Sequence, residues 1–573
     1  MPTDTSPNGT VSLVIAITGH RDLFPEDEKQ FEAAIQQILL KEKKKYPSTS
    51  LLLLSGLAEG ADRIAVRAAV GLEIPYVAVL PMAPEFYRDD FNSAQSNTEF
   101  EEMLQNAARV IEIPCSARLG LSHGATRDHQ YDCLGKFLVS ASQIMIAVWD
   151  QVRTSKPGGT SEVVALKLAE GRQNGRRGFA GPGSSGMGPV HILLARRQST
   201  GSEVPTGPKH EIRYPDGTSA DDFEASYRLI DQYNADVRAA GNLTREVATS
   251  RQNICGGQET SGLTPAMEWT ATVYSWADTL AIHYAARSLR LWKSVYILLA
   301  IAGVALTFLH ATESRTDWRL HIMYYLALAL AFSLGYWEIR DQHRQRHEEY
   351  RALAEALRVQ FFWLAAGLRD MAYENFLGKQ AGKTIWIRDA MSEISLYNDV
   401  ASTQTRNGVV GEAARLSLAR TWVEGQTGYF NKACRKHQKR HRLFNDVALV
   451  LVGVGFFLPL IGWLTPTFAS QEIPHLKQLA SIVPTIAMLW AALAWNYAEL
   501  RGYVQEARQY ARMHDLFYAA KSQLQNLERA AKPESFVAAQ TTIRELGQDA
   551  LEENGDWLSM HRERKLKPGI IAG

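Results

Sequence analysis

The sequence predicts two architectures in one chain: an N-terminal α/β domain built on a parallel sheet, and an α-helical membrane region with four transmembrane helices. Three observations predict this. Short apolar, β-branched runs alternate with helix-favouring segments up to about residue 200. Four longer apolar runs without Asp, Glu, Lys or Arg lie beyond residue 290, as expected of membrane-spanning helices. Aromatic residues cluster at the ends of those runs, as they do at membrane–water interfaces.

Six apolar runs are expected to form the parallel sheet, because strands buried on both faces read as continuous apolar segments. They are Ser12–Thr18, Leu51–Ser55, Tyr76–Leu80, Arg109–Ile113, Gln143–Trp149 and Val190–Ala195. The alternation of these strands with helices predicts that helices cover both faces of the sheet.

Helices are expected between the strands, near Glu26–Lys44, from Gly60 to Ala69 and near Gln130–Ser140. The Gly-rich stretch Gly175–Gly188 and the polar stretch Gln198–Asp216 are interpreted as loops. Two further helices, Phe223–Ala239 and Met267–Arg290, are expected to lead into the membrane region.

The four apolar runs approach, with their flanks, the ~20 residues that a helix needs to cross a bilayer. They are Val295–Leu309, Ile322–Tyr336, Val447–Leu464 and Leu479–Trp495. The alternative is a set of buried helices in a soluble protein. The aromatic ends and the pairing of the runs through short connections, Ala311–Arg319 and Pro466–Gln478, favour two membrane hairpins.

Lys and Arg flank the hairpins on one side, which predicts that both termini and the central segment face the cytosol. These cations include Arg287, Arg290, Lys293, Arg340, Arg344, Arg346, Lys432, Arg435, Lys436, Lys439, Arg440 and Arg442. Arg315 and Arg319 weaken the contrast in the first hairpin. Glu338-Ile339-Arg340 and Glu499-Leu500-Arg501 follow the second and fourth runs. They indicate either a duplicated unit or convergence on the composition of membrane helices.

Composition excludes several classes of protein. The 573 residues carry 62 Lys and Arg against 61 Asp and Glu, so nucleic acid is not expected as a partner. The four cysteines form no CxxC pair and no cluster with histidine, so neither a metal site nor a disulfide framework is expected. No signal peptide precedes the first strand, which predicts a cytosolic N-terminal domain.

Three polar, glycine-bearing turns follow expected strands: Thr18-Gly19-His20-Arg21, then Ser55 to Asp62, then Pro157 to Glu162. Ligands of parallel α/β sheets bind at the carboxyl ends of the strands. Glycines allow a ligand to approach the backbone, and a helix that begins near Gly60 would direct amide N–H groups at a phosphate. Arg21 would add a bidentate contact. The alternative is that these glycines only make tight turns.

Ser55-Gly56-Leu57-Ala58-Glu59-Gly60-Ala61-Asp62 resembles the signature of the SMF/DprA half of the SLOG superfamily. Thr18-Gly19-His20-Arg21 resembles the superfamily's first turn, and Pro157-Gly158-Gly159-Thr160-Ser161-Glu162 is similar to the LOG motif. The resemblance covers about Val11 to Arg197. It implies a Rossmann-like fold that binds a nucleotide-derived ligand, such as an ADP-ribose-type or cyclic nucleotide messenger. The family's LOG motif is Pro-Gly-Gly-x-Gly-Thr-x-x-Glu; here it is shortened and lacks the x-Gly pair before Thr160, which puts hydrolytic activity in doubt.

On this basis fifteen residues are candidates for ligand binding, and no catalytic residue is assigned. They are Thr18, Gly19, His20, Arg21, Ser55, Gly56, Leu57, Glu59, Gly60, Asp62, Arg127, Gly158, Gly159, Thr160 and Glu162. Tyr131 is a candidate for stacking on a base, and Tyr87–Phe91 for contact with ribose or base, the alternative being a solvated loop. His123 and His129 are expected at the surface or at a helix cap.

The second half resembles SLATT-type two-span modules, which accompany SLOG genes in bacterial antiphage defence. The expected domains are residues 1–200 for the nucleotide-binding domain, 201–290 for coupling helices, and 291–443 and 444–573 for the two hairpins with their cytosolic helices. The resemblance implies a homo-oligomeric effector in the bacterial inner membrane that opens an ion channel or pore on binding a messenger and so causes abortive infection. The alternatives are a membrane-tethered nucleotide hydrolase or glycosidase using Glu162 or Asp62, and a scaffold or transporter with a degenerate SLOG fold.

Overall fold

The computed structural model describes residues 9–91, 93–114, 125–154, 157–168, 186–199, 208–256, 263–311, 318–375, 385–397, 412–464, 474–530 and 534–563. His123, the Gly-rich stretch up to residue 185 and most of both hairpin connections lie outside these residues. The chain forms two compact units. The first, here called the sheet unit, comprises Met1–Leu280, Ala352–Leu418 and Gly547–Gly573; the second, the hairpin unit, comprises Ala281–Arg351 and Ala419–Leu546.

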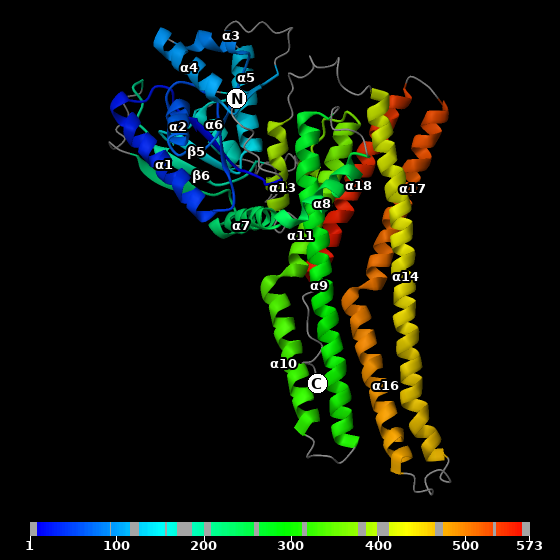
Figure 1. Cartoon of the computed structure of the whole chain (residues 1–573). Coiled ribbons are helices and arrows are strands. Elements are labelled where there is room, and N and C mark those ends of the chain that lie inside the picture. Colours follow the sequence, from blue (N-terminus) through cyan, green and yellow to red (C-terminus); the bar gives the residue numbers. More distant parts are fainter. Residues whose placement is uncertain are drawn as a thin grey trace. The chain divides into compact units, whose positions relative to one another are not determined.

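Seven strands form one sheet in the order β4-β3-β2-β1-β5-β6-β7. Strands β5 and β6 of this sheet are labelled in Figure 1. They are β1 Leu13–Gly19, β2 Leu51–Ser55, β3 Tyr76–Leu80, β4 Arg109–Glu112, β5 Ile144–Trp149, β6 Val190–Leu194 and β7 Lys209–Arg213. The first six pair in parallel, as predicted, and each agrees with its expected bounds to within one residue. Leu13 to Ile17 are all 0% exposed, and successive strand residues point to opposite faces, so both faces of β1 are covered.

Strand β7 corrects the expectation that Gln198–Asp216 is only a loop. It pairs antiparallel with β6 at the edge of the sheet. Its sequence, Lys-His-Glu-Ile-Arg, carries a single apolar residue, and none of the five is buried. An edge strand with both faces partly in water needs no apolar pattern, so the sequence offered no signal for it.

The helices of the sheet unit include α1 Glu28–Lys45, α2 Ala61–Val70, α4 Ala94–Asn106, α5 Ala125–Ala141, α6 Thr160–Lys167, α7 Ala220–Ala239 and α8 Thr244–Ile254. Helix α5 begins earlier than expected, so Arg127 and His129 lie within it. Residues Tyr87–Asp90 do not form a loop: they fall on α3 Pro84–Tyr87 and the 3₁₀ turn η2 Arg88–Asp90, and Phe91 follows directly. The Tyr87 ring is fully buried.

A distant segment completes the sheet unit at the amino ends of its strands. Every residue from Trp386 to Ser392 of helix α13, Ile385–Ser392, is buried, and so is every residue of the 3₁₀ turn η5, Glu393–Leu396. The Ser12 amide donates to Glu393 at 2.7 Å, and Arg109 donates to the Leu396 carbonyl at 3.1 Å. The segment between the two hairpins is therefore part of the core around the sheet.

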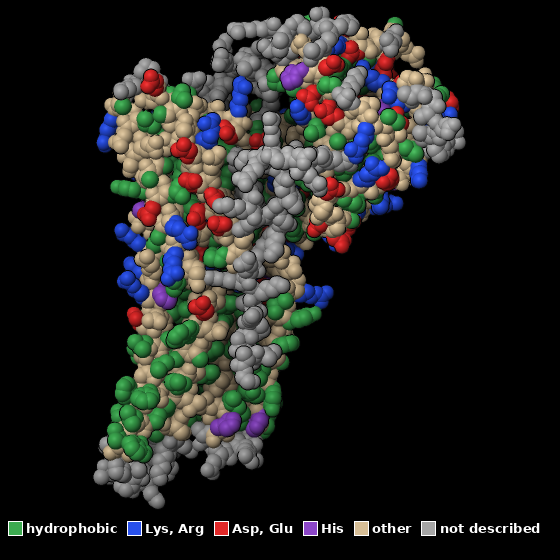
Figure 2. Space-filling model, turned by 180° about the vertical axis from the view of Figure 1, so that it is seen from behind, with side chains coloured by type: hydrophobic (Ala, Val, Ile, Leu, Met, Phe, Trp, Pro, Cys, Tyr) green, Lys and Arg blue, Asp and Glu red, His purple; other side chains and the backbone are tan. Residues whose placement is uncertain are grey.

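The remaining helices are α9 Pro265–Ala311, α10 Trp318–Asp341, α11 His343–Ala365, α12 Ala372–Asn375, α14 Glu412–Leu464, α16 Pro474–Arg501, α17 Tyr503–Ala530 and α18 Ser535–Glu563. Four helical segments are long and apolar enough to cross a membrane. Three of them contain a predicted run in full, and the other, Leu416–Ile461, contains the run Val447–Leu464 except for its last three residues. Large apolar side chains on them are exposed, with Phe332 and Trp463 each at 78%. Figure 2 shows hydrophobic side chains gathered along these helices, an arrangement that is compatible with a membrane protein.

Both hairpins end in the same backbone feature. Between α10 and α11 the single residue Gln342 has φ +52°, and between α16 and α17 Gly502 has φ +59°. Buried tyrosines, Tyr350 and Tyr510, each follow eight residues later. A left-handed residue interrupts the ladder of helical hydrogen bonds and redirects the chain. The repeated break supports the duplicated unit over convergence of composition.

Candidate functional site: the carboxyl edge of the sheet

The turns after β1 and β2 pack directly on one another. The Ala61 amide donates to the His20 carbonyl at 3.2 Å. Gly60 has φ +77°, and a Cβ there would lie 2.5 Å from the His20 oxygen. A Cβ on Gly19 would lie 2.4 Å from the Ala61 Cβ. Packing between turns therefore requires both glycines, and the first amide of α2 is bound to the protein's own backbone rather than directed at a ligand.

The turn from Ser55 to Asp62 is held by its own side chains. The Leu57 amide donates to Ser55 Oγ at 3.1 Å, and the Ala58 amide donates to Asp62 Oδ2 at 3.3 Å. Burial raises the pKa of Asp62 to about 6, although backbone N–H groups stabilise its charged form. Leu57 lies in the core with 0% exposure. Ser55, Leu57 and Asp62 thus shape the turn from inside.

Two neighbouring contacts extend this framework. Glu59 accepts a hydrogen bond from Ser96 of α4. A Cβ on Gly56 would lie 2.9 Å from Asp62 Oδ2, so only glycine fits beside the buried carboxyl. Glu59 and Gly56 were expected to bind a ligand. Their contacts show that they also hold the turn in place, a role that the sequence did not predict.

Arg21 is an accessible cation at this edge. Its side chain is 38% exposed, and its guanidinium lies 5.2 Å from the centroid of the Tyr131 ring. Arg21 Nη1 is 3.8 Å from Asp90 Oδ2, an oxygen that is buried and has no hydrogen-bond partner among the described residues. Arg21 can thus turn towards an anion at small cost, because no close hydrogen bond restrains it.

Arg127, in contrast, is held by contacts within the protein. Its Nη2 lies 2.7 Å from Asp90 Oδ1 and donates to the Phe86 carbonyl at 2.8 Å. Only 9% of its side chain is exposed. Arg127 therefore fastens helix α5 to the α3–η2 segment, a role that its sequence position did not indicate.

His20 and Asp150 form a buried pair at the ends of β1 and β5. His20 Nε2 lies 3.0 Å from Asp150 Oδ1 and 3.2 Å from the Asp150 amide nitrogen. Burial lowers the pKa of His20, and the neighbouring carboxylate offsets only part of that effect. Sequence reasoning missed Asp150, although it directly follows a buried strand, as polar site residues often do.

The third turn leads into α6. Gly158 has φ +69°, and a Cβ there would lie 2.3 Å from the Tyr131 carbonyl carbon. The Gly158 amide donates to Glu162 Oε2 at 2.7 Å, so this carboxylate closes its own turn. Within the described ranges no hydrogen bond uses the amides of Thr160 or Ser161. The start of α6 is thus better suited than that of α2 to bind an anion.

These contacts join the three predicted turns into one continuous surface. Gly60 packs on Arg21, Arg21 lies over Tyr131, and Tyr131 packs on Gly158. The groups that remain to engage a ligand are the Arg21 guanidinium and the backbone around Gly159 and Thr160. Among the described residues no cluster of three or more His, Cys, Asp or Glu is placed to hold a metal ion.

Comparisons with protein-family models, with curated proteins and with solved structures found no match to the chain.

Proposed function

We propose that the chain is a SLOG-type sensor that binds a nucleotide-derived messenger and opens a path through the bacterial inner membrane. One observation carries the proposal. An accessible arginine lies at the carboxyl edge of a parallel sheet, and so does the start of α6, whose first two amides have no hydrogen-bond partner among the described residues, in a chain with four apolar helices. A phosphate is the group that such an edge binds best, because it accepts both guanidinium and backbone N–H donors.

The side chains of the site favour binding of the messenger without its hydrolysis. Asp62 and Glu162, the two candidate catalytic carboxylates, both accept hydrogen bonds from backbone amides. A general base must reach the proton that it removes. Carboxylates that close their own turns are poorly placed for that task, so the hydrolase alternative ranks second.

Helix α9 provides the covalent route from sensor to membrane. It runs without interruption from Pro265 to Ala311 and contains the first apolar run. Its residue Val273 accepts a hydrogen bond from Tyr233 of α7 at 3.3 Å. A ligand shifts gating only by its differential affinity for two states, and a shift from 1% to 99% open needs about 5.5 kcal/mol. Several sites in a homo-oligomer supply that energy more readily than one site does.

The experiment has two stages. The full-length purified protein is screened for thermal shift against nucleotides and nucleotide-derived messengers, because a ligand that binds the native state raises its apparent stability. Any hit is then tested for leakage of dye from liposomes that contain the protein. We expect leakage that needs the ligand, persists with a non-hydrolysable analogue and disappears in Arg21→Ala.

Two outcomes would redirect the proposal. Leakage that follows ligand turnover, with a silent analogue, would favour the membrane-tethered hydrolase. Absence of binding to every nucleotide in the library would favour the scaffold or transporter with a degenerate SLOG fold. In either case the messenger mechanism would be abandoned.

A further inference from the structure

Two buried polar atoms beside Arg21 have no hydrogen-bond partner among the described residues: Asp90 Oδ2 and the hydroxyl oxygen of Tyr131. Arg21 Nη1 lies 3.8 Å from Asp90 Oδ2, and the guanidinium lies 5.2 Å from the centroid of the Tyr131 ring. A buried polar atom without a partner costs free energy, so a ligand that supplied the missing partners would recover it.

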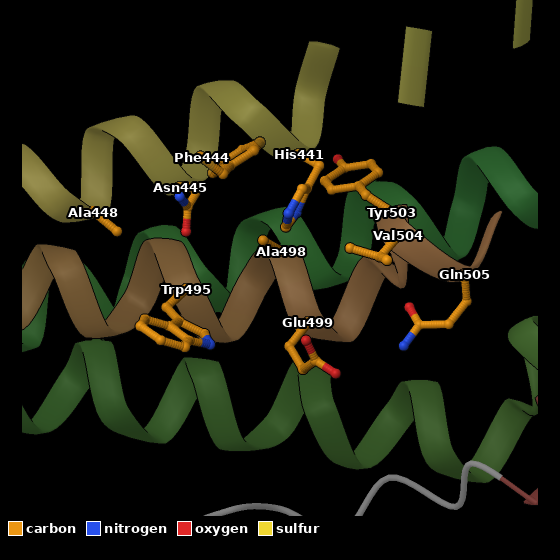
Figure 3. Close-up of a pocket in the computed structure, with 10 residues that line it drawn as sticks. All are labelled: His441, Phe444, Asn445, Ala448, Trp495, Ala498, Glu499, Tyr503, Val504 and Gln505. Atoms are coloured by element: carbon orange, nitrogen blue, oxygen red, sulfur yellow. The ribbon is translucent and has the colours of Figure 1, made fainter. Parts of the chain in front are cut away.

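The cavity in the hairpin unit offers no such unmet hydrogen bonds. It has a volume of about 130 Å³ and lies between α14, α16 and α17 (Figure 3). Its lining contains the carboxylate Glu499 and no Lys or Arg. None of its lining side chains holds a buried polar atom without a partner. The carboxyl edge of the sheet therefore says more about a ligand than this cavity does.

Asp90 is held in one orientation by Arg127. Arg127 Nε donates to Asp90 Oδ1 at 2.9 Å, and Arg127 Nη2 lies 2.7 Å from the same oxygen. Oδ2 is left for a different partner. Arg21 does not fill this role, because 3.8 Å exceeds the ~3.2 Å limit of an N–H···O hydrogen bond. If Arg21 turned towards an anion, Oδ2 would also lose this neighbouring charge.

The three groups together define the chemistry of a ligand. The guanidinium of Arg21 and the hydroxyl of Tyr131 donate hydrogen bonds, so both suit the oxygens of a phosphate. Asp90 Oδ2 only accepts, and a phosphate next to it would be repelled. The ligand must therefore bring a donor as well as its phosphate. In a nucleotide the sugar lies between phosphate and base, so its hydroxyls are the donors closest to the phosphate.

From this geometry we infer that Asp90 recognises a ribose hydroxyl of the ligand, while Arg21 and Tyr131 bind its phosphate. The ligand class is a nucleotide with a free hydroxyl on its sugar. This narrows the expectation that Tyr87–Phe91 contacts ribose or base to one residue and one chemical group. The inference rests on the proposed function, since it needs a phosphate at this edge, but it adds a specificity for the sugar.

Asp90→Asn changes only the atom in question. Arg127 donates to Oδ1 and needs an acceptor there, so the amide oxygen of asparagine takes that position and its NH₂ group replaces Oδ2. The acceptor thus becomes a donor, while the contact with Arg127 remains. Asp89→Asn is the matched control, because the neighbouring Asp89 is exposed and loses the same charge.

The test is calorimetric titration of the full-length protein with ADP and with its dideoxy analogue, which lacks both ribose hydroxyls. We expect the wild type and Asp89→Asn to bind ADP roughly tenfold or more tightly than the analogue. In Asp90→Asn this preference should disappear. The analogue should bind to Asp90→Asn at least as tightly as to the wild type, because an NH₂ group attracts the phosphate that a carboxylate repels. The thermal unfolding midpoint checks that each variant is folded.

Arg21→Ala separates the sugar from the phosphate. It should weaken both nucleotides to the same extent and leave the preference for ADP intact, because Arg21 contacts only the phosphate. Loss of the preference in this variant would contradict the division of roles between Arg21 and Asp90.

The other outcomes are also decisive. Equal affinities of the wild type for both nucleotides would end the inference and leave the phosphate site in place. A preference for ADP that persists in Asp90→Asn would assign the hydroxyl to another residue and refute the role of Asp90. If the wild type binds neither nucleotide, this inference is wrong, even if another member of the nucleotide library binds. Only the absence of all nucleotide binding would end the proposed function as well.

Discussion

The side-chain amide of Gln143 donates a 2.8 Å hydrogen bond to the backbone carbonyl of Asp389, although 246 residues separate the two in the chain. The same side chain accepts from the Val14 amide at 2.6 Å and donates to Ser392 at 2.7 Å. One residue before it, the Ser142 carbonyl accepts from Lys167 at 2.6 Å. Helix α6, which starts at the candidate anion site, therefore ends beside the contact that holds α13.

Under the proposed function, this arrangement would give the sheet unit a second connection to the hairpins. Helix α13 lies in the segment that precedes the second hairpin, whereas α9 leads covalently into the first. A displacement of α6 on ligand binding would act on Ser142, on Gln143 and then on α13 through hydrogen bonds between buried groups. Buried polar contacts of this kind have few alternative partners, so they transmit a shift rather than absorb it.

Replacing Gln143 by Met should destabilise the protein by roughly 1–3 kcal/mol, because the Val14 amide and the Asp389 carbonyl would remain buried without partners. The thermal unfolding midpoint of the full-length protein measures this. Gln37→Met, on the exposed side of α1, is the control and should leave the midpoint unchanged. Equal midpoints for the wild type and Gln143→Met would contradict the docking of α13.

Arg21 and Arg127 should respond differently to the same change. Arg21→Ala removes an accessible cation and should weaken binding of a phosphate-bearing ligand about 10- to 150-fold with little loss of stability. Arg127→Ala removes hydrogen bonds within the fold and should lower the unfolding midpoint. Calorimetric titration and thermal unfolding of both variants separate the roles. The assignment is wrong if Arg127→Ala keeps full stability and Arg21→Ala keeps full affinity.

Asp62 should make the protein more stable at mildly acidic pH than at neutral pH. Burial raises its pKa from 3.8 to about 6 in the folded state, so the unfolded chain loses the proton first as the pH rises. Its contribution is therefore present below about pH 4 and is lost as the pH rises to about 6, by a total on the order of 3 kcal/mol. Asp62→Asn removes this titration.

The measurement is the free energy of unfolding of the wild type minus that of Asp62→Asn, between pH 4 and pH 7. We expect this difference to increase as the pH falls. Asp89→Asn, at an exposed position of η2, is the control. A difference that does not change with pH would mean that Asp62 is ionised in the folded protein throughout that range.

At the two left-handed residues, introducing a glycine and removing one should change the stability of the protein in opposite directions. Gln342→Gly should stabilise the protein by about 1 kcal/mol, because glycine adopts a φ of +52° without strain. Gly502→Ala should destabilise it by a similar amount, because alanine at +59° is strained. Gln345→Gly, inside α11, is the control and should destabilise. Unfolding midpoints that move in the same direction for all three would refute the left-handed breaks.

The proposed topology predicts which side of the membrane each helix end faces. In a variant without the four native cysteines, a thiol introduced at His310 should react with an impermeant reagent added from the periplasm, and one at Gln345 should not. Both positions are exposed. Thr316, Gln471 and Gly573, which would extend the test, lie outside the described residues. Labelling of Gln345 from the periplasm would reverse the orientation.

Elements whose side chains all face the same environment could be predicted from local sequence. Strands β1, β2 and β3 are buried on both faces, so their residues had to be apolar and their bounds could be read directly. The four apolar runs are likewise uniform, and uniform stretches need no knowledge of the rest of the fold. The three turns could be placed at one edge of the sheet because parallel strands carry their carboxyl ends together.

The roles of individual polar side chains, in contrast, depend on contacts between segments far apart in the chain. Arg21 and Arg127 were both candidates for phosphate binding in the sequence, yet Asp90 binds Arg127 closely and leaves Arg21 accessible. Helix α13 contains Arg388 and Asp389, and no local sequence pattern predicts that both are buried. A hydrogen bond depends on distances of a few tenths of an ångström between segments far apart in the chain, and local pattern carries no information about such distances.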